Sequence, residues 1–162
     1  YPTPPDIELV ANNIIVKGLG GRSEITYRTC DISMITVPPE KALVIPSPEI
    51  KFQLTGEDLA WITRASAVLL APDLSFRSNG KRITMVVYSA ADNSSNTNSV
   101  DIAEGDGSIF NINYEVSHLN MLADSYNVAI SSKGVSKFTA VTKQIEYFVA
   151  TGKGTTYSPA GA

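Results

Sequence analysis

The sequence predicts an α+β fold in which one β-α-β-β-β unit occurs twice along the chain. Three observations support this: alternating apolar residues before a helix with a capping signal, a glycine-containing hairpin after that helix, and the same order of features about sixty residues later. A short motif recurs by chance more easily than a matched order and phase over about fifty residues. The duplication is therefore the main structural inference from the sequence.

The first unit begins with a strand that leads directly into a helix. In residues 50–54 apolar side chains alternate with polar ones, which is typical of a strand with one buried face. Thr55 suits the N-cap of a helix, and Asp58 completes a capping box and also favours the positive end of the helix dipole. Because Pro72 follows, we expect the helix to end near Leu69.

Hairpin signals follow this helix and recur in the second unit. Ser78-Asn79-Gly80 predicts a tight turn between two strands, and Ser132-Lys133-Gly134 predicts a second one. Residues 110–114 repeat the alternation of the first strand. The second turn lies about six residues closer to its alternating strand than the first turn lies to residues 50–54. We therefore expect a second, shorter helix at about Ser117–Asp124.

The composition is that of a globular protein. Of the 162 residues, 43% are hydrophobic and 18% are charged. A chain of this length is long enough for one full domain and part of another. The net charge of −3 argues against a protein coated in basic residues for nucleic acid, but it permits a local basic surface. No apolar run approaches the roughly 20 residues of a membrane span, so no membrane partner is expected. Cys30 is the single cysteine, which favours a reducing compartment.

Motifs for catalysis or metal binding are missing from the sequence. His118 is the only histidine, so a surface or helix-cap role is a simpler interpretation than a zinc site or a Ser-His-Asp site. Residues 152–156 read Gly-Lys-Gly-Thr-Thr but lack the upstream glycine of a phosphate-binding loop. A solvated loop also explains Asp101, Glu104 and Asp106 more simply than a cation site does. We expect no enzyme activity, no metal and no cofactor.

The distribution of proline divides the chain into segments. Residues 37–48 contain four prolines around an apolar centre, which predicts an extended connector between domains. Residues 1–36 hold three short strand patterns, too few to bury a core, and the initial Tyr1 suggests a processed or truncated start. Residues 49–151 are expected to form one complete domain, and residues 152–162 a flexible tail. The three strand patterns are Asp6–Val10, Asn13–Lys17 and Glu24–Cys30.

The first predicted helix has two contrasting sides. The side expected to pack on the sheet carries Leu59, Trp61, Ile62, Ala65, Val68 and Leu69. The opposite side carries Ala60, Thr63, Arg64 and Ala67. This side is small and nearly neutral, with Arg64 as its only cation, so it could lie close to a phosphate backbone. On physical grounds alone, an ordinary amphipathic surface helix is the simpler interpretation.

The order of these elements resembles that of a known family. The residues that carry the resemblance are 49–59, Arg64, the hairpin 78–81, and the strand 126–130 ahead of Lys133 and Gly134. In this order they resemble DNA sliding clamps, most closely the polymerase accessory clamps of T-even-like bacteriophages and cyanophages. The resemblance implies the DNA clamp fold, with two helices packed on one face of a curved antiparallel sheet. It also implies that residues 1–36 are the last strands of an N-terminal clamp domain and that residues 49–151 are the C-terminal one.

The resemblance further implies a non-catalytic processivity factor. Such a clamp encircles duplex DNA without regard to sequence and tethers the replicative DNA polymerase, in the cytoplasm of an infected bacterial host. It implies peptides of the polymerase and of the clamp loader as partners, and a homo-oligomeric ring, a trimer when the chain is full length. An alternative from another class is a phage structural or assembly protein that self-associates through β edge strands.

The same resemblance assigns roles to individual residues. The DNA-facing residues would be Arg64, Thr63, Asn120, Lys81 and Lys133. The partner-peptide pocket would be formed by Leu43, Val44, Ile45, Tyr147 and Phe148, although these apolar residues could also simply hold the connector against the domain. The protomer interface would involve Glu24, Tyr27, Val100 and Ile102.

Overall fold

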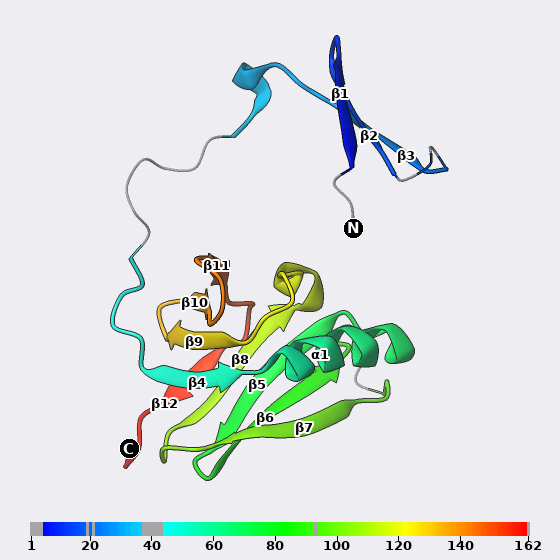
Figure 1. Cartoon of the computed structure of the whole chain (residues 1–162). Helices are drawn as coiled ribbons and strands as arrows, with labels where there is room; N and C mark the ends of the chain where they lie inside the picture. Colours follow the sequence, from blue (N-terminus) through cyan, green and yellow to red (C-terminus); the bar gives the residue numbers. More distant parts are fainter. Residues whose placement is uncertain (1–4, 19, 21, 37–43, 93, 162) are drawn as a thin grey trace. The chain divides into compact units, whose positions relative to one another are not determined.

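The computed structural model describes residues 5–18, 20, 22–36, 44–92 and 94–161. The chain divides into two compact units, Tyr1–Ala42 and Leu43–Ala162. Figure 1 shows the smaller unit in blue and the larger one in cyan to red. Each unit is described by itself below.

The smaller unit is a three-stranded antiparallel sheet. Its strands are β1 (Asp6–Val10), β2 (Asn13–Lys17) and β3 (Glu24–Arg28), in that spatial order, followed by a 3₁₀ turn, η2 (Ile32–Met34). The strand register aligns Ile7 with Val16 and Ile25 across one face. All three predicted strands are therefore present, although β3 ends two residues earlier than expected.

The larger unit contains the duplication. The first repeat consists of β4 (Ile50–Leu54), α1 (Gly56–Leu69), β5 (Asp73–Asn79), β6 (Arg82–Tyr88) and β7 (Asn98–Glu104). The second consists of β8 (Ile109–Glu115), η3 (Val116–Leu119), β9 (Tyr126–Ser131), β10 (Val135–Ala140) and β11 (Glu146–Ala150), and a final strand, β12 (Thr156–Ser158), follows. The order of elements recurs, with a 3₁₀ turn where the first repeat has its α-helix.

The two repeats form two antiparallel sheets by exchanging a strand. The four-stranded sheet has the order β11-β10-β9-β4, and the five-stranded sheet has the order β12-β8-β5-β6-β7. The first strand of each repeat thus joins the sheet built by the other repeat: β4 pairs with β9, and β8 pairs with β5. Figure 1 shows β4 beside β9 and β8 beside β5. The duplication therefore produces one domain.

A line of aromatic rings connects the two sheets in the core. Phe52 of β4 lies 5.1 Å from Phe76 of β5, Phe76 lies 5.7 Å from Tyr114 of β8, and Tyr114 lies 6.3 Å from Phe138 of β10, measured between ring centroids. Edge-to-face pairs at such separations add to the stabilisation that comes from burial alone. Phe76, Tyr114 and Phe138 are buried, so these rings form the centre of the domain.

Helix α1 begins and ends where the sequence predicts. The Asp58 backbone N–H donates to Thr55 Oγ1 at 3.1 Å, and the Thr55 backbone N–H donates to Asp58 Oδ2 at 2.9 Å, which completes the capping box. The helix ends at Leu69, and Leu70 adopts a left-handed conformation with φ of 53°. Among the described residues, no helix has the length and apolarity to cross a membrane.

One of the residues predicted on the buried side of α1 is exposed in the structure. Ile62 and Ala65 are buried, and the helix packs against β6 and η3, but Val68 is 82% exposed. Val68 lies in the last turn of the helix, about 100° around the axis from Leu69, which packs against the core, so the Val68 side chain faces outward.

The prediction of a second α-helix at Ser117–Asp124 is wrong. The described structure has only a four-residue turn, η3, at the start of this segment. Glu115 stands at the N-cap without a side-chain cap bond, and a helix of this length is marginal without one. Other elements bind the backbone instead: the Leu122 N–H donates to Tyr147 Oη at 3.3 Å, and Lys143 Nζ donates to the Ala123 carbonyl at 2.9 Å. Only Leu119 of η3 is buried.

The prediction of a flexible tail is wrong for residues 152–158. The Gly152 N–H donates to the carbonyl of Asn113 at 2.6 Å, and Asn113 Nδ2 donates to the carbonyl of Lys153 at 3.0 Å. After this turn, β12 pairs antiparallel with β8. Asn113 thus fixes the turn that brings β12 to the edge of the five-stranded sheet.

Candidate functional site

The outward face of α1 has the small, nearly neutral character that the sequence predicts. Thr63 and Arg64 are both exposed there. Glu57 is also exposed in the first turn, so the helix face carries one acid and one cation. Arg64 borders a hollow of about 210 Å³ that lies between the C-terminal half of α1 and Asn98, the first residue of β7. Arg64 can therefore reach a ligand that approaches this face.

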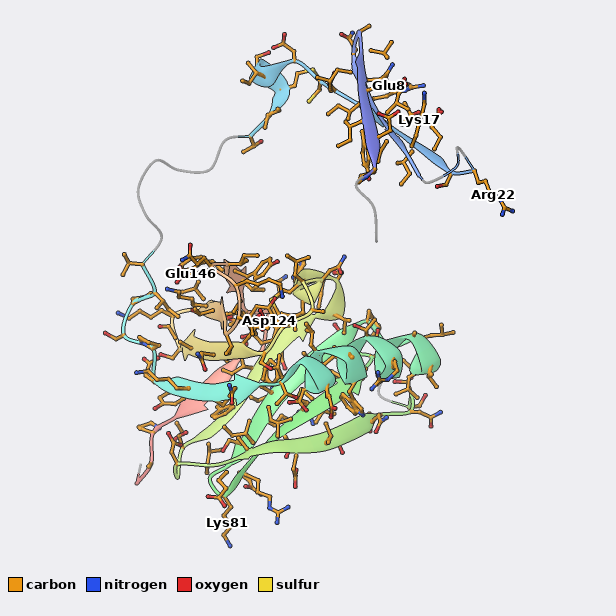
Figure 2. The ribbon with its side chains drawn as sticks, viewed as in Figure 1. Glu8, Lys17, Arg22, Lys81, Asp124 and Glu146 are labelled. Atoms are coloured by element: carbon orange, nitrogen blue, oxygen red, sulfur yellow. The ribbon has the colours of Figure 1, made fainter. Side chains whose placement is uncertain are left out.

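The other predicted DNA-facing residues come from three different places. Asn120 is exposed directly after η3, a turn that packs against α1. Lys81 is exposed in the β5–β6 turn, and Figure 2 shows it at the tip of that hairpin, away from α1. Lys133 is exposed in the β9–β10 turn near the carboxylate of Glu49. Asn120 thus follows a turn that contacts the helix, and the two lysines lie on hairpin turns.

Glu49 is held at the β9–β10 turn by the residue before Lys133. The Ser132 backbone N–H and hydroxyl each donate to its carboxylate at 2.9 Å. These bonds, with a smaller contribution from the charge of Lys133, lower the pKa of Glu49 below its ordinary value. The positive charge of Lys133 is therefore partly balanced within the protein.

The predicted partner pocket is only partly assembled. Leu43 lies outside the described residues, Val44 is 83% exposed, and Ile45 is half-buried. Tyr147 and Phe148 are neighbours on β11 and therefore face opposite sides of the four-stranded sheet. Tyr147 packs edge-on against Tyr126 in the core, with ring centroids 6.0 Å apart. Only Phe148 is on the outer face, which corrects the grouping of these two side chains in one pocket.

The outer face of this sheet has a feature that the sequence analysis missed. The strand register aligns Lys51 of β4, Ala129 of β9, Lys137 of β10 and Phe148 of β11 in one row across all four strands. A hollow of about 500 Å³ lies here, with Lys51, Ala129 and Lys137 among its lining residues. The sequence does show that polar residues alternate with core residues in three of these strands. It does not show the register that aligns the outward-facing residues in one row.

The predicted interface strands are sheet edges. β3 is an edge of the three-stranded sheet, and β7 is an edge of the five-stranded sheet. Glu24 and Tyr27 are exposed on β3, Tyr27 by 56%. Val100 and Ile102 are half-buried and pack against the core. The outer edge of β7 therefore offers a partner its free backbone N–H and C=O groups, whereas the side chains of Val100 and Ile102 are largely used within the domain.

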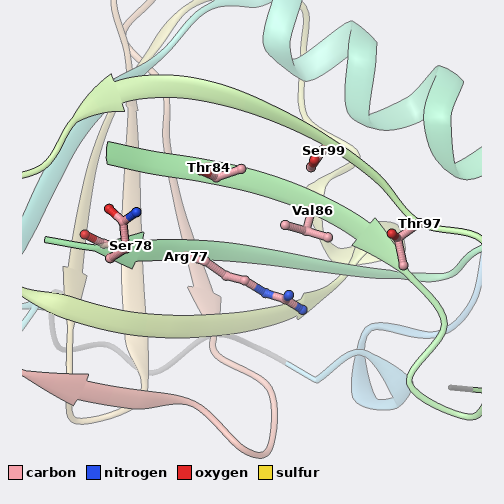
Figure 3. Close-up of a pocket in the computed structure, with 7 residues that line it drawn as sticks. Arg77, Ser78, Thr84, Val86, Thr97 and Ser99 are labelled. Carbon is pink, nitrogen blue, oxygen red and sulfur yellow. The ribbon is translucent and has the colours of Figure 1, made fainter. Parts of the chain in front are cut away.

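A third hollow lies on the outer face of the five-stranded sheet. Figure 3 shows its lining of Arg77 from β5, Thr84 and Val86 from β6, and Ser99 from β7, and its volume is about 380 Å³. Arg77 is already engaged: its Nε donates to Ser75 Oγ at 3.2 Å, and its guanidinium lies 5.3 Å from the ring centroid of Tyr88. Across the described residues, no group of three or more His, Cys, Asp or Glu side chains could hold a metal ion.

Two strand-exchanged repeats around one core, with a helix packed beside two antiparallel sheets, define the DNA clamp fold. Solved clamps share it at low sequence identity. The PCNA2-PCNA3 complex of Sulfolobus tokodaii matches with a TM-score of 0.53 at 15% identity, over 90% of this chain and 63% of that chain. PCNA of A. fulgidus, bound to the C-terminal region of FEN-1, matches with a TM-score of 0.52 at 16% identity, over 91% of this chain and 63% of that chain. The predicted α+β clamp fold is thus confirmed.

The chain belongs to the gp45 sliding clamp family, whose C-terminal model matches residues 51–153. A curated relative is the sliding clamp of Vibrio phage KVP40, which is 29% identical over 143 residues. This match covers 85% of the chain and 63% of the relative, so the chain spans less than two thirds of the relative's length. The predicted resemblance to phage clamps is confirmed.

Proposed function

We propose that this protein acts as a sliding clamp, a non-catalytic processivity factor that encircles duplex DNA and tethers a replicative polymerase. The observation that carries the proposal is the family match over residues 51–153, which contain both repeats except for Ile50. The exposed face of α1 supports it, because small side chains with one cation suit transient contact with a passing phosphate backbone. The protein would work in the cytoplasm of an infected bacterial host.

The proposed mechanism is topological. Arg64 contacts phosphates from α1, Thr63 and Asn120 add neutral hydrogen-bonding groups nearby, and Lys81 and Lys133 contribute charge from the turns. Such contacts do not depend on base sequence. Because each one is weak and rapidly exchanged, the ring slides while the tethered polymerase stays at high local concentration near the primer end.

The ring would be a homo-oligomer, three protomers in the full-length protein. Strands β3 and β7 are edges that can pair head to tail, a heterologous contact that closes into a ring when the rotation fits. Glu24 and Tyr27 would contribute side chains from β3, and Val100 and Ile102 would support the edge of β7. Peptides of the polymerase and the clamp loader would bind at the connector residues 43–45 and on the outer face beside Phe148.

The test is binding of the full chain to a fluorescent primer–template duplex over a range of salt concentrations. We expect Arg64→Glu to weaken binding several-fold, and to reduce the slope of log K against log salt by about one for each protomer in contact with DNA. Lys153→Glu makes the same charge change in the turn before β12, away from α1, and serves as the control. Equal weakening by both variants would contradict the assignment of Arg64.

The competing function is a phage structural or assembly protein that associates through β edge strands. The exposed edges of β3 and β7 favour it. This function predicts self-association without salt-sensitive binding to duplex DNA, so the same titration separates the two proposals.

A further inference from the structure

We propose that Glu49 is a positioning residue that sets the path of the connector where it enters β4. Its carboxylate binds the β9–β10 turn of the second repeat and thereby fixes residues 46–48, which come directly before it. The inference rests on the proposed function only in taking the connector as a binding segment for partners. The positioning itself needs no partner and can be tested without one.

Glu49 is attached to the second repeat at three points. The Ser132 backbone N–H donates to Glu49 Oε2 and the Ser132 hydroxyl donates to Glu49 Oε1, both at 2.9 Å. The Glu49 backbone N–H donates to the Ile130 carbonyl at 3.1 Å. Hydrogen bonds to a carboxylate are shorter and stronger than those between neutral groups. Because both carboxylate oxygens and the backbone are engaged, the bonds fix the orientation of Glu49 as well as its place.

The β9–β10 turn is a well-held anchor for this carboxylate. Ser131, the residue before Ser132, is buried, and its Oγ accepts from the Lys133 N–H at 3.3 Å. The Gly134 N–H donates to the Ser131 carbonyl at 3.1 Å, and the Gly134 carbonyl accepts from the Thr151 N–H at 3.0 Å. The turn is therefore held from both sides, and the two Ser132 donors are already oriented for a carboxylate.

The end of the connector has no hydrogen bonds of its own to fix it. Residues 44–48 donate and accept none with any other part of the described chain, and Pro46 and Pro48 have no N–H to donate. Ser47 has φ of 38°, although a positive φ is uncommon outside glycine and a following proline favours extended backbone. Such a conformation persists where neighbouring contacts fix it. Glu49, two residues later, makes those contacts.

The test is ¹⁵N relaxation of the full chain, which reports the order of the Ile45 and Ser47 amides on the ps–ns timescale. Glu49→Ala should lower the order parameters of these two connector amides from about 0.85 to below about 0.6. Ser132→Ala removes the hydroxyl but keeps the N–H, so it should give an intermediate loss. Glu104→Ala, which removes an exposed acid at the end of β7, is the control and should change neither amide.

The double variant Glu49→Ala/Ser132→Ala shows whether the two residues act through the same bonds. If they do, it should loosen the connector amides no more than Glu49→Ala alone, and a larger loss would overturn the inference. Unchanged order of these amides in Glu49→Ala would overturn it as well. An equal loss of order at Phe52 of β4 and Val128 of β9 would do the same, because Glu49 would then support the whole sheet. None of these results depends on DNA, so the salt titration tests the clamp function separately.

Discussion

The hydroxyl of Tyr114 donates a hydrogen bond of 2.8 Å to Ser136 Oγ, which joins β8 of one sheet to β10 of the other. Ser136 Oγ in turn donates to the carbonyl of Val149 on β11, also at 2.8 Å. All three residues are buried. Burial raises the pKa of Tyr114, so its hydroxyl remains protonated and keeps its role as donor.

This chain of bonds predicts an order of destabilisation. Tyr114→Phe removes one buried bond and should cost about 1 kcal/mol of unfolding free energy. Ser136→Ala leaves both the Tyr114 hydroxyl and the Val149 carbonyl without this partner, and should cost about 2 kcal/mol or more. Urea unfolding of both variants measures the difference. A larger loss in Tyr114→Phe would contradict the proposed direction of the bonds.

The capping box of α1 gives a second prediction. Thr55→Ala removes the oxygen that accepts from the Asp58 N–H, and should reduce the unfolding free energy by about 1 kcal/mol. Thr63→Ala is the matched control, since Thr63 is exposed within the helix and alanine has the higher helix propensity. The control should be neutral or slightly stabilising in the same urea titration, and equal losses would rule out a specific role for the cap.

Asp124 predicts a pH dependence on the acid side. Its side chain is only 2% exposed, and its carboxylate accepts from Thr142 Oγ1 at 2.6 Å and from Lys143 Nζ at 3.2 Å. The Thr142 bond is the main cause that lowers the pKa of Asp124 below 3.8. The folded state therefore holds the Asp124 proton less tightly than the unfolded state does. The contribution of Asp124 to the unfolding free energy is fully present above its ordinary pKa and is lost as pH falls through the lower pKa of the folded state.

Asp124→Asn should therefore be less stable than the parent chain near pH 7 and should lose less additional stability below pH 4. Thermal unfolding at a series of pH values measures both effects. Parallel pH curves for the two proteins would show that Asp124 is not one of the groups responsible for acid sensitivity.

The two sides of α1 predict contrasting effects of truncation. Ile62 is buried against the sheet, so Ile62→Ala should cost about 2–5 kcal/mol. Val68→Ala should change the unfolding free energy by no more than about 0.5 kcal/mol, because Val68 is 82% exposed. A large effect at Val68 in the isolated chain would mean that the last turn of α1 packs more closely than the structure indicates.

The parts of the fold that were predicted correctly have local causes. Alternation in residues 50–54, the Thr55–Asp58 capping pair and the glycine turns each depend on residues within a few positions of one another. Gly80 and Gly134 adopt φ of 88° and 94°, as the tight turns require. Propensity and periodicity report such short-range features directly.

The parts that were missed depend on distant residues. The region of the second predicted helix is held by Tyr147 and Lys143, and the tail is fixed by Asn113, about forty residues earlier in the chain. The row that aligns Lys51 with Lys137 depends on strand register between the two repeats. No local pattern specifies these partners, so these contacts and this row could be found only in the folded chain.

The strand exchange between the two repeats also has a kinetic meaning. Pairing of Ile50 with Ile130 closes a loop of about eighty residues, and it must form before the four-stranded sheet is complete. Contacts of such high sequence separation make folding slow, and neither repeat holds all the strands of a sheet. A ribosome must therefore release most of this domain before either half can reach a stable structure.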